Sequence, residues 1–284
     1  MPIRVLALLA AVLALAGCST ISRGTAQLTD SFPDGSSVHT VNVGGLYRSY
    51  RLHRPSGLPA SAPLVVMLHG GFGSGEQAER AYGWDQLADT EKFVVAYPDG
   101  IARAWNVHGC CGRPSQDGID DVAFITSMVD QISDGIGIDR TRIYATGISN
   151  GGMMSYTLAC NSDMFAAIGP DSATQLDSCG SPRPTSVMHI HGTDDRMIRY
   201  SGGPGAGVAH IDGPPVPEVN AFWRKVDQCG EPTVATDGAL TTSAAGCQDN
   251  RSVVLVTVAG GEHEWPSFAT QKLWEFFAAH PALK

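Results

Sequence analysis

Residues 144–156, YATGISNGGMMSY, decide how this chain of 284 residues is interpreted. An apolar segment leads into the stretch and helix-forming residues follow, so a strand is expected to pass directly into a helix. At that junction residues 147–151 follow the pattern G-x-S-x-G. On a strand-to-helix turn this pattern holds its serine exposed and strained, ready to attack a carbonyl carbon. Because the pattern is common by chance, its meaning depends on the rest of the chain.

Apolar and helical segments alternate on both sides of this turn. Strands are expected at 38–43, 47–53, 63–68, 93–97, 142–146, 186–190 and 253–258, and helices at 77–91, 120–136, 150–160, 218–227 and 266–280. The first two strands alternate apolar and polar residues, as an antiparallel edge hairpin does. The alternation of strands and helices predicts an α/β fold with a mostly parallel central sheet and helices on both faces.

Composition narrows the class of protein. Hydrophobic residues make up 43% of the chain and charged residues 17%, which is typical of a globular protein. Residues 38–284 are interpreted as one domain, with a surface loop over 201–217. The net charge of −9 and the absence of a Lys/Arg cluster in the sequence argue against a nucleic-acid partner.

The N-terminus has the pattern of a targeting segment. Residues 1–18 contain Arg4, a short apolar run and Cys18 after small residues, which predicts a lipoprotein signal peptide whose cysteine is lipidated. An ordinary cleavage site followed by a chance cysteine is the alternative. Residues 19–37 would then be a flexible tether. The protein is expected to be exported, either as a cell-envelope lipoprotein held to a membrane through Cys18 or as a secreted protein.

Six cysteines follow Cys18, and an even number in an exported protein predicts three disulfides. Cys229 and Cys247 flank a short polar segment and are expected to pair. The adjacent Cys110 and Cys111 are expected to reach two different partners, Cys160 and Cys179, more easily than each other. A zinc site is the alternative, although the spacing resembles no common zinc pattern.

Three residues in the order Ser, Asp, His could form a catalytic triad. A serine hydroxyl needs a base within reach, and the base needs an orienting carboxylate. Ser149 comes first, either Asp194 or Asp195 follows the strand at 186–190, and His263 follows the strand at 253–258. Open α/β sheets place their sites at these carboxyl ends of strands.

A tetrahedral intermediate also requires backbone donors for its oxyanion. Asn150, directly after the serine, would supply one amide. The other should come from the loop after the strand at 63–68, where Gly71 is the first choice and Phe72 the second.

Taken together, these motifs resemble the polyhydroxybutyrate depolymerase and feruloyl esterase group of α/β-hydrolases (carbohydrate esterase family one), including LpqC-type lipoproteins. The resemblance covers roughly residues 38–280. It rests on motifs at 69–71, 97–100, 105–106, 110–112, 120–122, 147–152, 191–195 and 261–266, all in the order expected of that group. One departure is Arg199, which stands where members of the group often have proline.

The resemblance implies roles for individual residues. Ser149 would be the nucleophile, His263 the base and Asp195, the second aspartate of H-G-T-x-D, the acid. Trp105 and Trp265 would bind substrate by stacking, with core packing as the alternative. No metal or organic cofactor is implied.

The sequence therefore predicts a serine esterase acting on feruloyl, acetyl or 3-hydroxybutyryl esters through an acyl-enzyme. A serine peptidase of the same fold is one alternative, although such peptidases usually carry a large extra domain. A catalytically silent lipoprotein that binds carbohydrate or polymer is another, and the intact Ser, Asp and His set argues against it.

Overall fold

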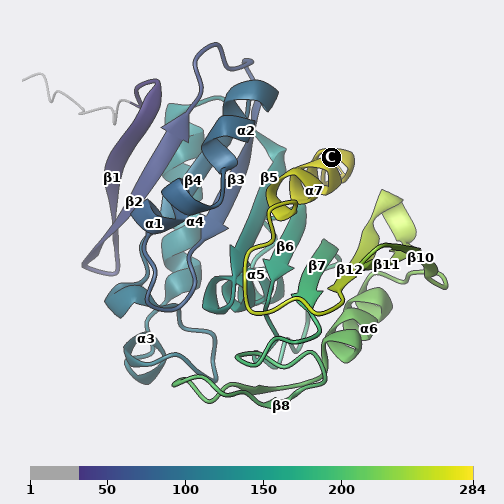
Figure 1. Ribbon diagram of the computed structural model, residues 1–284. Helices are drawn as coiled ribbons and strands as arrows, with labels where there is room; N and C mark the ends of the chain where they lie inside the picture. The colour runs from purple at the N-terminus through teal and green to yellow at the C-terminus, as the bar shows by residue number, and fades with distance from the viewer. Residues whose placement is uncertain (1–31, 284) are drawn as a thin grey trace, which may run out of the picture. The chain divides into compact units, whose positions relative to one another are not determined.

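A ten-stranded sheet is the centre of this computed structural model, which describes residues 32–283 (Figure 1). The strands, in chain order, are β1 (Gly35–Val43), β2 (Leu46–Arg54), β3 (Ala62–Leu68), β4 (Val94–Pro98), β5 (Ile138–Ile148), β6 (Ala167–Asp171), β7 (Ser186–Gly192), β8 (Gly203–Pro204), β9 (Asp212–Gly213), β10 (Thr233–Asp237), β11 (Leu240–Gly246) and β12 (Ser252–Val258). The main sheet has the order β1-β2-β4-β3-β5-β6-β7-β12-β11-β10, and β8 pairs separately with β9.

The middle of the sheet is parallel and its two ends are antiparallel. Strands β4, β3, β5, β6, β7 and β12 pair in parallel. The hairpin β1–β2 extends one side, and the hairpin β10–β11 extends the other. Six parallel strands inside one sheet confirm the predicted α/β class.

Helices cover both faces of the sheet (Figure 1). They are α1 (Gly75–Ala81), α2 (Trp84–Glu91), α3 (Arg113–Gln116), α4 (Asp121–Gly135), α5 (Asn150–Asn161), α6 (Val216–Val226) and α7 (Ala269–Ala279), with short 3-10 helices at Ile101–Arg103 and Gln248–Asn250. Buried side chains of α4, α5 and α6 share one core cluster, and those of α1, α2 and α7 share the other.

Strand β3 shows how its sequence creates two cores. Leu64, Val66 and Leu68 contribute to the cluster with α4 and α5, whereas Val65 and Met67 contribute to the cluster with α7. Successive side chains of a strand point to opposite faces, so a strand buried on both faces must be apolar at every position. This explains why a continuous apolar run, rather than an alternating one, marks the centre of the sheet.

Several elements differ from the sequence predictions. The single helix expected at 77–91 is two helices, because Gly83 adopts a left-handed conformation (φ 70°) between α1 and α2. Strand β6 was not predicted; it is short and ends in Gly169, Pro170 and Asp171, which are poor strand formers. The hairpin β10–β11 was also missed, because its threonine-rich strands, exposed in β10 and half-buried in β11, carry no clear apolar signal.

The described residues also change one domain boundary. Residues 35–37 lie in β1 and Phe32 is buried, so the predicted tether over 19–37 ends before that point. The predicted signal peptide, Cys18 and residues 19–31 lie outside the described residues. Within residues 32–283, no helix has both the length and the apolar character that crossing a membrane requires.

Candidate active site

Ser149 occupies a sharp turn between β5 and α5. Its backbone has φ 56° and ψ −123°, a conformation that non-glycine residues rarely adopt. The Ser149 amide donates to Asp171 O at 2.9 Å, and Ser149 O accepts from the Met153 amide, the first bond of the helix. Residues held in such a conformation cluster at functional sites, because the surrounding structure must stabilise them.

The glycines around Ser149 are required by close packing. A Cβ atom on Gly147 would lie 2.6 Å from Leu68 O, and one on Gly151 would lie 2.2 Å from the same oxygen. A Cβ atom on Gly152 would lie 2.7 Å from the Ala173 Cβ. The G-x-S-x-G-G pattern therefore allows the start of α5 to pack directly against the end of β3.

His263 and Asp195 form a hydrogen-bonded pair at the carboxyl ends of β12 and β7. His263 Nδ1 lies 2.8 Å from Asp195 Oδ2, and the Asp195 side chain is fully buried. The other oxygen, Oδ1, accepts from the amides of Met197 and Ile198 at 2.8 and 2.9 Å. Asp194 is exposed and bonds to Thr193. Of the two candidate acids, Asp195 is therefore the one that His263 contacts.

Electrostatics keep the Asp195 carboxyl ionised. Burial by itself raises the pKa of Asp195. Hydrogen bonds from His191 and His263, together with the charge of His263, outweigh burial and hold the pKa below its usual range. An ionised carboxylate fixes the proton of His263 on Nδ1, which leaves Nε2 as the basic nitrogen.

A buried hydrogen-bond chain leads from α5 to Asp195. Tyr156 Oη lies 2.9 Å from His189 Nδ1, and His189 Nε2 lies 3.0 Å from His191 Nδ1. His191 Nε2 lies 2.8 Å from Ile198 O and 3.3 Å from Asp195 Oδ2. Because Ile198 O only accepts, His191 Nε2 donates to it. Burial, followed by the neighbouring His191, lowers the pKa of His189, so the His189 ring is neutral and joins the chain with one donor nitrogen and one acceptor nitrogen.

The loop after β3 brings Gly71 and Phe72 beside Ser149 and Asn150, around one cavity. The Phe72 amide donates to Arg103 O at 2.8 Å, so this N–H is already engaged. Gly71 is therefore the better placed of the two loop donors. His69 supports the loop: Nδ1 donates to Gly70 O at 2.8 Å and Nε2 accepts from the Gly100 amide at 2.9 Å. Burial lowers the pKa of His69, which keeps this neutral form.

The cavity beside Ser149 has a volume of about 480 Å³. Its wall is mainly apolar, and it includes both Ser149 and His263. The lining residues are Gly71, Phe72, Ala102, Arg103, Ala104, Cys111, Gly112, Arg113, Ser149, Asn150, Met197, Gly207, Val208, Ala209, His210, Ile211 and His263. The cavity therefore offers an apolar group of substrate a binding site within reach of the strained serine.

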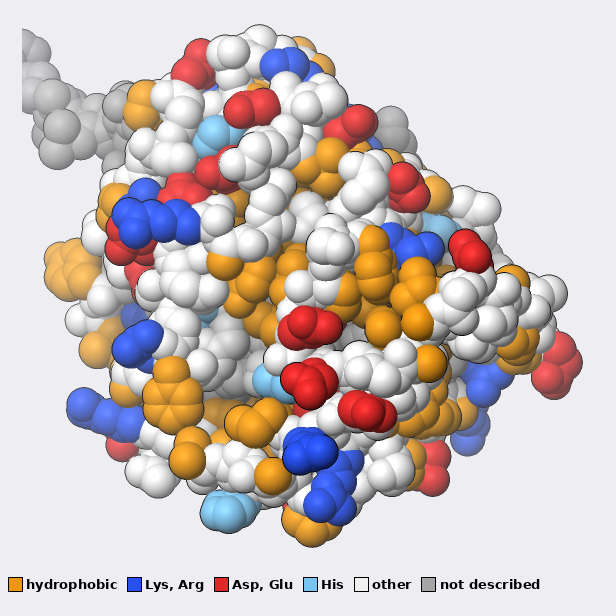
Figure 2. All heavy atoms as spheres, in the orientation of Figure 1, with side chains coloured by type: hydrophobic (Ala, Val, Ile, Leu, Met, Phe, Trp, Pro, Cys, Tyr) orange, Lys and Arg blue, Asp and Glu red, His pale blue; other side chains and the backbone are white. Residues whose placement is uncertain are grey.

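Charge on the molecular surface is dispersed on the face drawn in Figure 2. Lys and Arg side chains are scattered there among Asp, Glu and hydrophobic side chains. On this face, residues 32–283 form no continuous field of one charge.

The two tryptophans predicted to bind substrate do not line this cavity. Trp105 is fully buried, its Nε1 donates to His69 O at 2.9 Å, and its amide donates to Asn150 Oδ1 at 2.7 Å. Trp265 packs against Tyr82 and lines a separate surface hollow. The stacking interpretation is thus wrong for Trp105, which is a core residue beneath the oxyanion loop, and the placement of Trp265 does not support it either.

The cysteine pairing is partly as predicted. Cys229 pairs with Cys247, as expected. Cys160 pairs with Cys179, and Cys110 pairs with its neighbour Cys111, so the prediction of two different partners is wrong. The left-handed backbone at Cys111 (φ 84°) turns the two side chains toward each other. All six cysteines after Cys18 are therefore in disulfides, which leaves none of them to bind zinc.

Several wall residues were not singled out in the sequence. Residues 207–211 come from the Gly/Pro-rich segment 201–217 that was interpreted as a plain surface loop, and Met197 comes from the turn that follows Asp195. Their only sequence signal is their position after Asp195, at the carboxyl end of β7. His189 and His191, two apart on one strand and ahead of Asp195, could have indicated a shared buried face.

Comparisons with known proteins identify the family of this chain. The pattern of the family described as "Esterase PHB depolymerase" matches residues 48–198. A putative esterase, NocK, of Nocardia uniformis subsp. tsuyamanensis is 32% identical over 81% of this chain and 74% of its own length. Feruloyl esterase B of Piromyces equi is 32% identical over 74% of this chain and 41% of its own length.

A solved structure shows the same fold. The acetyl xylan esterase from Aspergillus awamori superposes with a TM-score of 0.66 at 16% identity, covering 86% of this chain and 99% of that one. This likeness confirms the α/β-hydrolase fold predicted from the sequence. The family match over residues 48–198, with relatives at 32% identity, shows that the chain belongs to the esterase PHB depolymerase family and is a carboxylic ester hydrolase.

Proposed function

We propose that the protein is an exported serine esterase that acts through Ser149, His263 and Asp195 and forms an acyl-enzyme. The observation that carries this proposal is the His263–Asp195 hydrogen bond of 2.8 Å at the wall of the cavity that also contains the strained Ser149. A strained serine and an imidazole that border one cavity, with a buried acid bonded to the imidazole, are the components that acyl transfer requires.

The first half of the reaction forms an ester on the enzyme. Ser149 Oγ attacks the carbonyl carbon of the substrate while His263 Nε2 takes the hydroxyl proton. Asp195 stabilises the resulting imidazolium, and the amides of Gly71 and Asn150 donate to the oxyanion. The tetrahedral intermediate then collapses, the C–O bond to the alcohol breaks, and the alcohol leaves with the proton from His263.

The second half releases the acid. A water molecule attacks the acyl-enzyme, and His263 Nε2 takes a proton from that water. The new tetrahedral intermediate expels Ser149 Oγ, which recovers the proton from His263. The products are a carboxylic acid and an alcohol, and the protein returns to its starting state.

The cavity favours an acyl group larger than acetyl. Its wall is mainly apolar and its volume of about 480 Å³ exceeds what a methyl group fills. Feruloyl and 3-hydroxybutyryl groups both suit such a space, and relatives of this chain include feruloyl esterase B. An aromatic acyl group is the better candidate, because flat rings bury more area against apolar walls.

Hydrolysis assays test the proposal. Residues 19–284 and their Ser149→Ala variant would be compared with methyl ferulate, 4-nitrophenyl acetate, 4-nitrophenyl butyrate and a 3-hydroxybutyrate oligomer. We expect turnover of at least one ester by the first protein only, together with labelling of Ser149 by a fluorophosphonate. A folded wild-type protein that neither hydrolyses an ester nor accepts the label would refute the triad.

Export and lipidation at Cys18 are a separate part of the proposal. Three disulfides within residues 32–283 support an oxidising compartment. Mass spectrometry of the mature protein would identify its N-terminus: a diacylated Cys18 is expected. An unmodified N-terminus at another residue would instead favour ordinary cleavage and secretion.

A further inference from the structure

One of the three disulfides reaches the candidate active site. Cys111 lines the cavity that contains Ser149 and His263, together with the next residues, Gly112 and Arg113. Among the described residues, the cysteines of the other two disulfides do not line that cavity. Of the three disulfides in the described part of the chain, the Cys110–Cys111 bond is therefore the one that borders the cavity.

The backbone at this disulfide has an unusual conformation. Cys111 and Gly112 both have positive φ values, 84° and 77°. Glycine adopts that conformation at little cost, but a residue with a Cβ atom needs support from its surroundings. A bond between adjacent cysteines closes a small ring around their shared peptide, so it supplies that support and restricts the loop tip to one shape.

The base of the same loop is anchored separately. Asn106 donates from its amide to Asp121 Oδ2 at 2.8 Å and from Nδ2 to Ile119 O at 2.9 Å. The Asn106 Oδ1 atom accepts from the His108 amide at 3.2 Å. The loop is therefore held where it leaves the core, before it reaches the two cysteines.

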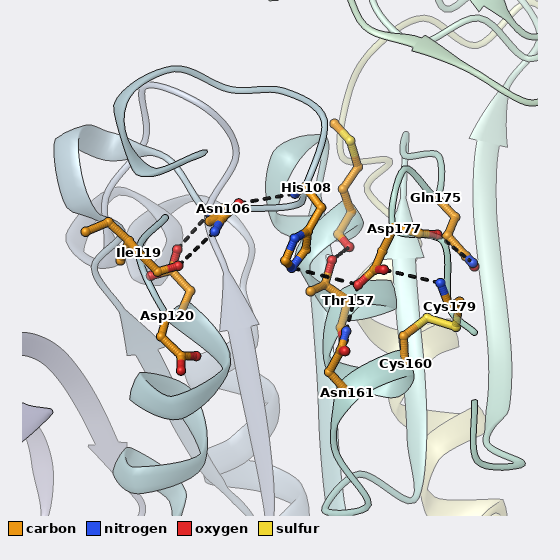
Figure 3. A network of polar contacts seen from close by, with 12 residues as sticks. Asn106, His108, Ile119, Asp120, Thr157, Cys160, Asn161, Gln175, Asp177 and Cys179 are labelled. Atoms are coloured by element: carbon orange, nitrogen blue, oxygen red, sulfur yellow. Dashed lines mark hydrogen bonds and ion pairs between the residues drawn. A yellow bond between two sulfur atoms is a disulfide. The ribbon is translucent and has the colours of Figure 1, made fainter. Parts of the chain in front are cut away.

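The loop also contacts a second segment of the chain, through His108 and Asp177. Figure 3 shows His108 directed toward Asp177, whose Oδ2 lies 4.0 Å from His108 Nε2. Asp177 accepts in turn from Asn161 Nδ2 at 2.7 Å and from the amide of Cys179, which is bonded to Cys160. The base of the loop is hydrogen-bonded through Asn106, and the Cys110–Cys111 bond lies at its tip.

The disulfide contributes an apolar part of the wall at this tip, beside the charged Arg113. A disulfide has no N–H or O–H donor, and sulfur makes favourable contacts with aromatic rings. Other parts of the wall include Met197 and Ile211, which are also apolar. The cavity is therefore shaped for an apolar group, with Cys111 as one of its boundaries.

We infer that the Cys110–Cys111 disulfide is a specificity-determining element that shapes the cavity for a bulky apolar acyl group. This inference rests on the proposed function, because it assigns the cavity to the acyl part of the ester. Without the bond, the tip of the loop leaves its left-handed conformation and the wall at Cys111 shifts. A large acyl group then loses contacts that a small acyl group never makes.

A pair of substrates with one leaving group tests the inference. The full-length chain and its Cys110→Ala/Cys111→Ala variant would be compared on 4-nitrophenyl ferulate and 4-nitrophenyl acetate. We expect the ratio of kcat/KM for ferulate over acetate to fall by about tenfold or more, mainly through KM for ferulate. A loss of this size corresponds to the misfit of about one methylene group in an apolar pocket.

Two further variants make the result specific. Cys229→Ala/Cys247→Ala removes a disulfide away from the cavity and is expected to keep the wild-type ratio. Cys110→Ala/Cys111→Gly removes the bond but allows φ 84°, and it is expected to lower the ratio as the first variant does.

The outcomes separate the inference from the function on which it rests. An equal loss on both esters, or an equal change of ratio in the Cys229/Cys247 control, would overturn the inference. Failure of both Cys110/Cys111 variants to fold while the control folds would also overturn it, because the bond would then serve folding. Wild-type activity that persists in Ser149→Ala would instead refute the proposed function.

Discussion

His191 Nε2 lies 3.3 Å from Asp195 Oδ2, the same carboxylate oxygen that lies 2.8 Å from His263 Nδ1. Two imidazoles therefore share one oxygen of a buried acid, and only His263 borders the cavity. His191 is held in place by contacts with Ile198 O and with His189. Tyr156 contacts the other ring nitrogen of His189 and is the last residue of the chain of contacts. This arrangement makes His191 a positioning residue for Asp195.

Loss of the His191 donor should alter the basicity of His263. In His191→Leu the Asp195 carboxylate loses a hydrogen bond, becomes more basic and holds the proton of His263 more firmly. We expect the pKa that governs the acid limb of kcat/KM to rise, and kcat/KM at pH values below that pKa to fall, because the base is then protonated over a wider range of pH. His191→Gln, which retains an N–H donor, should restore most of both. An acid limb at the wild-type pH in His191→Leu would exclude this role.

The two neighbouring aspartates should differ sharply in function. Asp195→Asn removes the charge that stabilises the His263 imidazolium, so we expect kcat to fall by roughly 10⁴-fold, as in serine proteases that lose the equivalent charge. Asp194→Asn is the matched control, because Asp194 is exposed and does not contact His263. Steady-state hydrolysis of 4-nitrophenyl acetate measures both. Greater loss in Asp194→Asn than in Asp195→Asn would reverse the assignment.

Buried neutral histidines should make the fold sensitive to acid. Burial, with His191 as a smaller cause, lowers the pKa of His189 below its ordinary value near 6.5. The unfolded chain then binds a proton that the native state excludes, so the free energy of unfolding falls as pH decreases below about 6.5. Each such histidine contributes up to about 1.4 kcal/mol per pH unit.

Urea unfolding of His189→Gln across pH 4–7 would measure this contribution. We expect a shallower decline of stability with acid than in the wild type, alongside a lower stability at pH 7, since Tyr156 loses its partner. His210→Gln, at an exposed histidine, should leave the decline unchanged. A decline in His189→Gln as steep as that of the wild type would contradict the assignment.

Asp171 should have the opposite pH dependence. It is buried, and its Oδ2 atom has no hydrogen-bond partner among the described residues. Burial raises the pKa of Asp171 well above its usual range, with the charges of Asp195 and Glu264 acting in the same direction. The native state therefore keeps a proton that the unfolded chain releases above about pH 4, and stability falls as pH rises.

Asp171→Asn replaces the carboxyl group with an amide that does not titrate, so this proton no longer contributes to the pH dependence of the free energy of unfolding. We expect the variant to gain stability over the wild type by an amount that grows between pH 5 and pH 8, at up to about 1.4 kcal/mol per pH unit. Urea midpoints at the two pH values would show it, with the exposed Asp194→Asn as the control. A stability difference that is the same at pH 5 and pH 8 would mean that Asp171 is ionised in the native protein.

The sequence by itself determined the class of fold and the order of the reactive residues. Continuous apolar runs such as residues 63–68 predicted buried parallel strands, because a strand covered on both faces has no position for a polar side chain. The G-x-S-x-G pattern predicted the turn at Ser149, because only small residues fit where α5 meets β3. Each pattern lies within one segment, so it can be recognised before the contacts of that segment with other segments are known.

Only the tertiary structure decided which distant residues meet. The choice of Asp195 over Asp194 depends on the loops after β7 and β12, and the engagement of the Phe72 amide depends on Arg103 O. The Cys110–Cys111 bond likewise depends on a backbone conformation that no spacing of cysteines reveals. Trp105 is an aromatic residue of the kind that can bind substrate, but the packing of the segments around it makes it a core residue. Contacts between segments far apart in the chain follow from how the layers pack, and a pattern read along one segment does not contain that information.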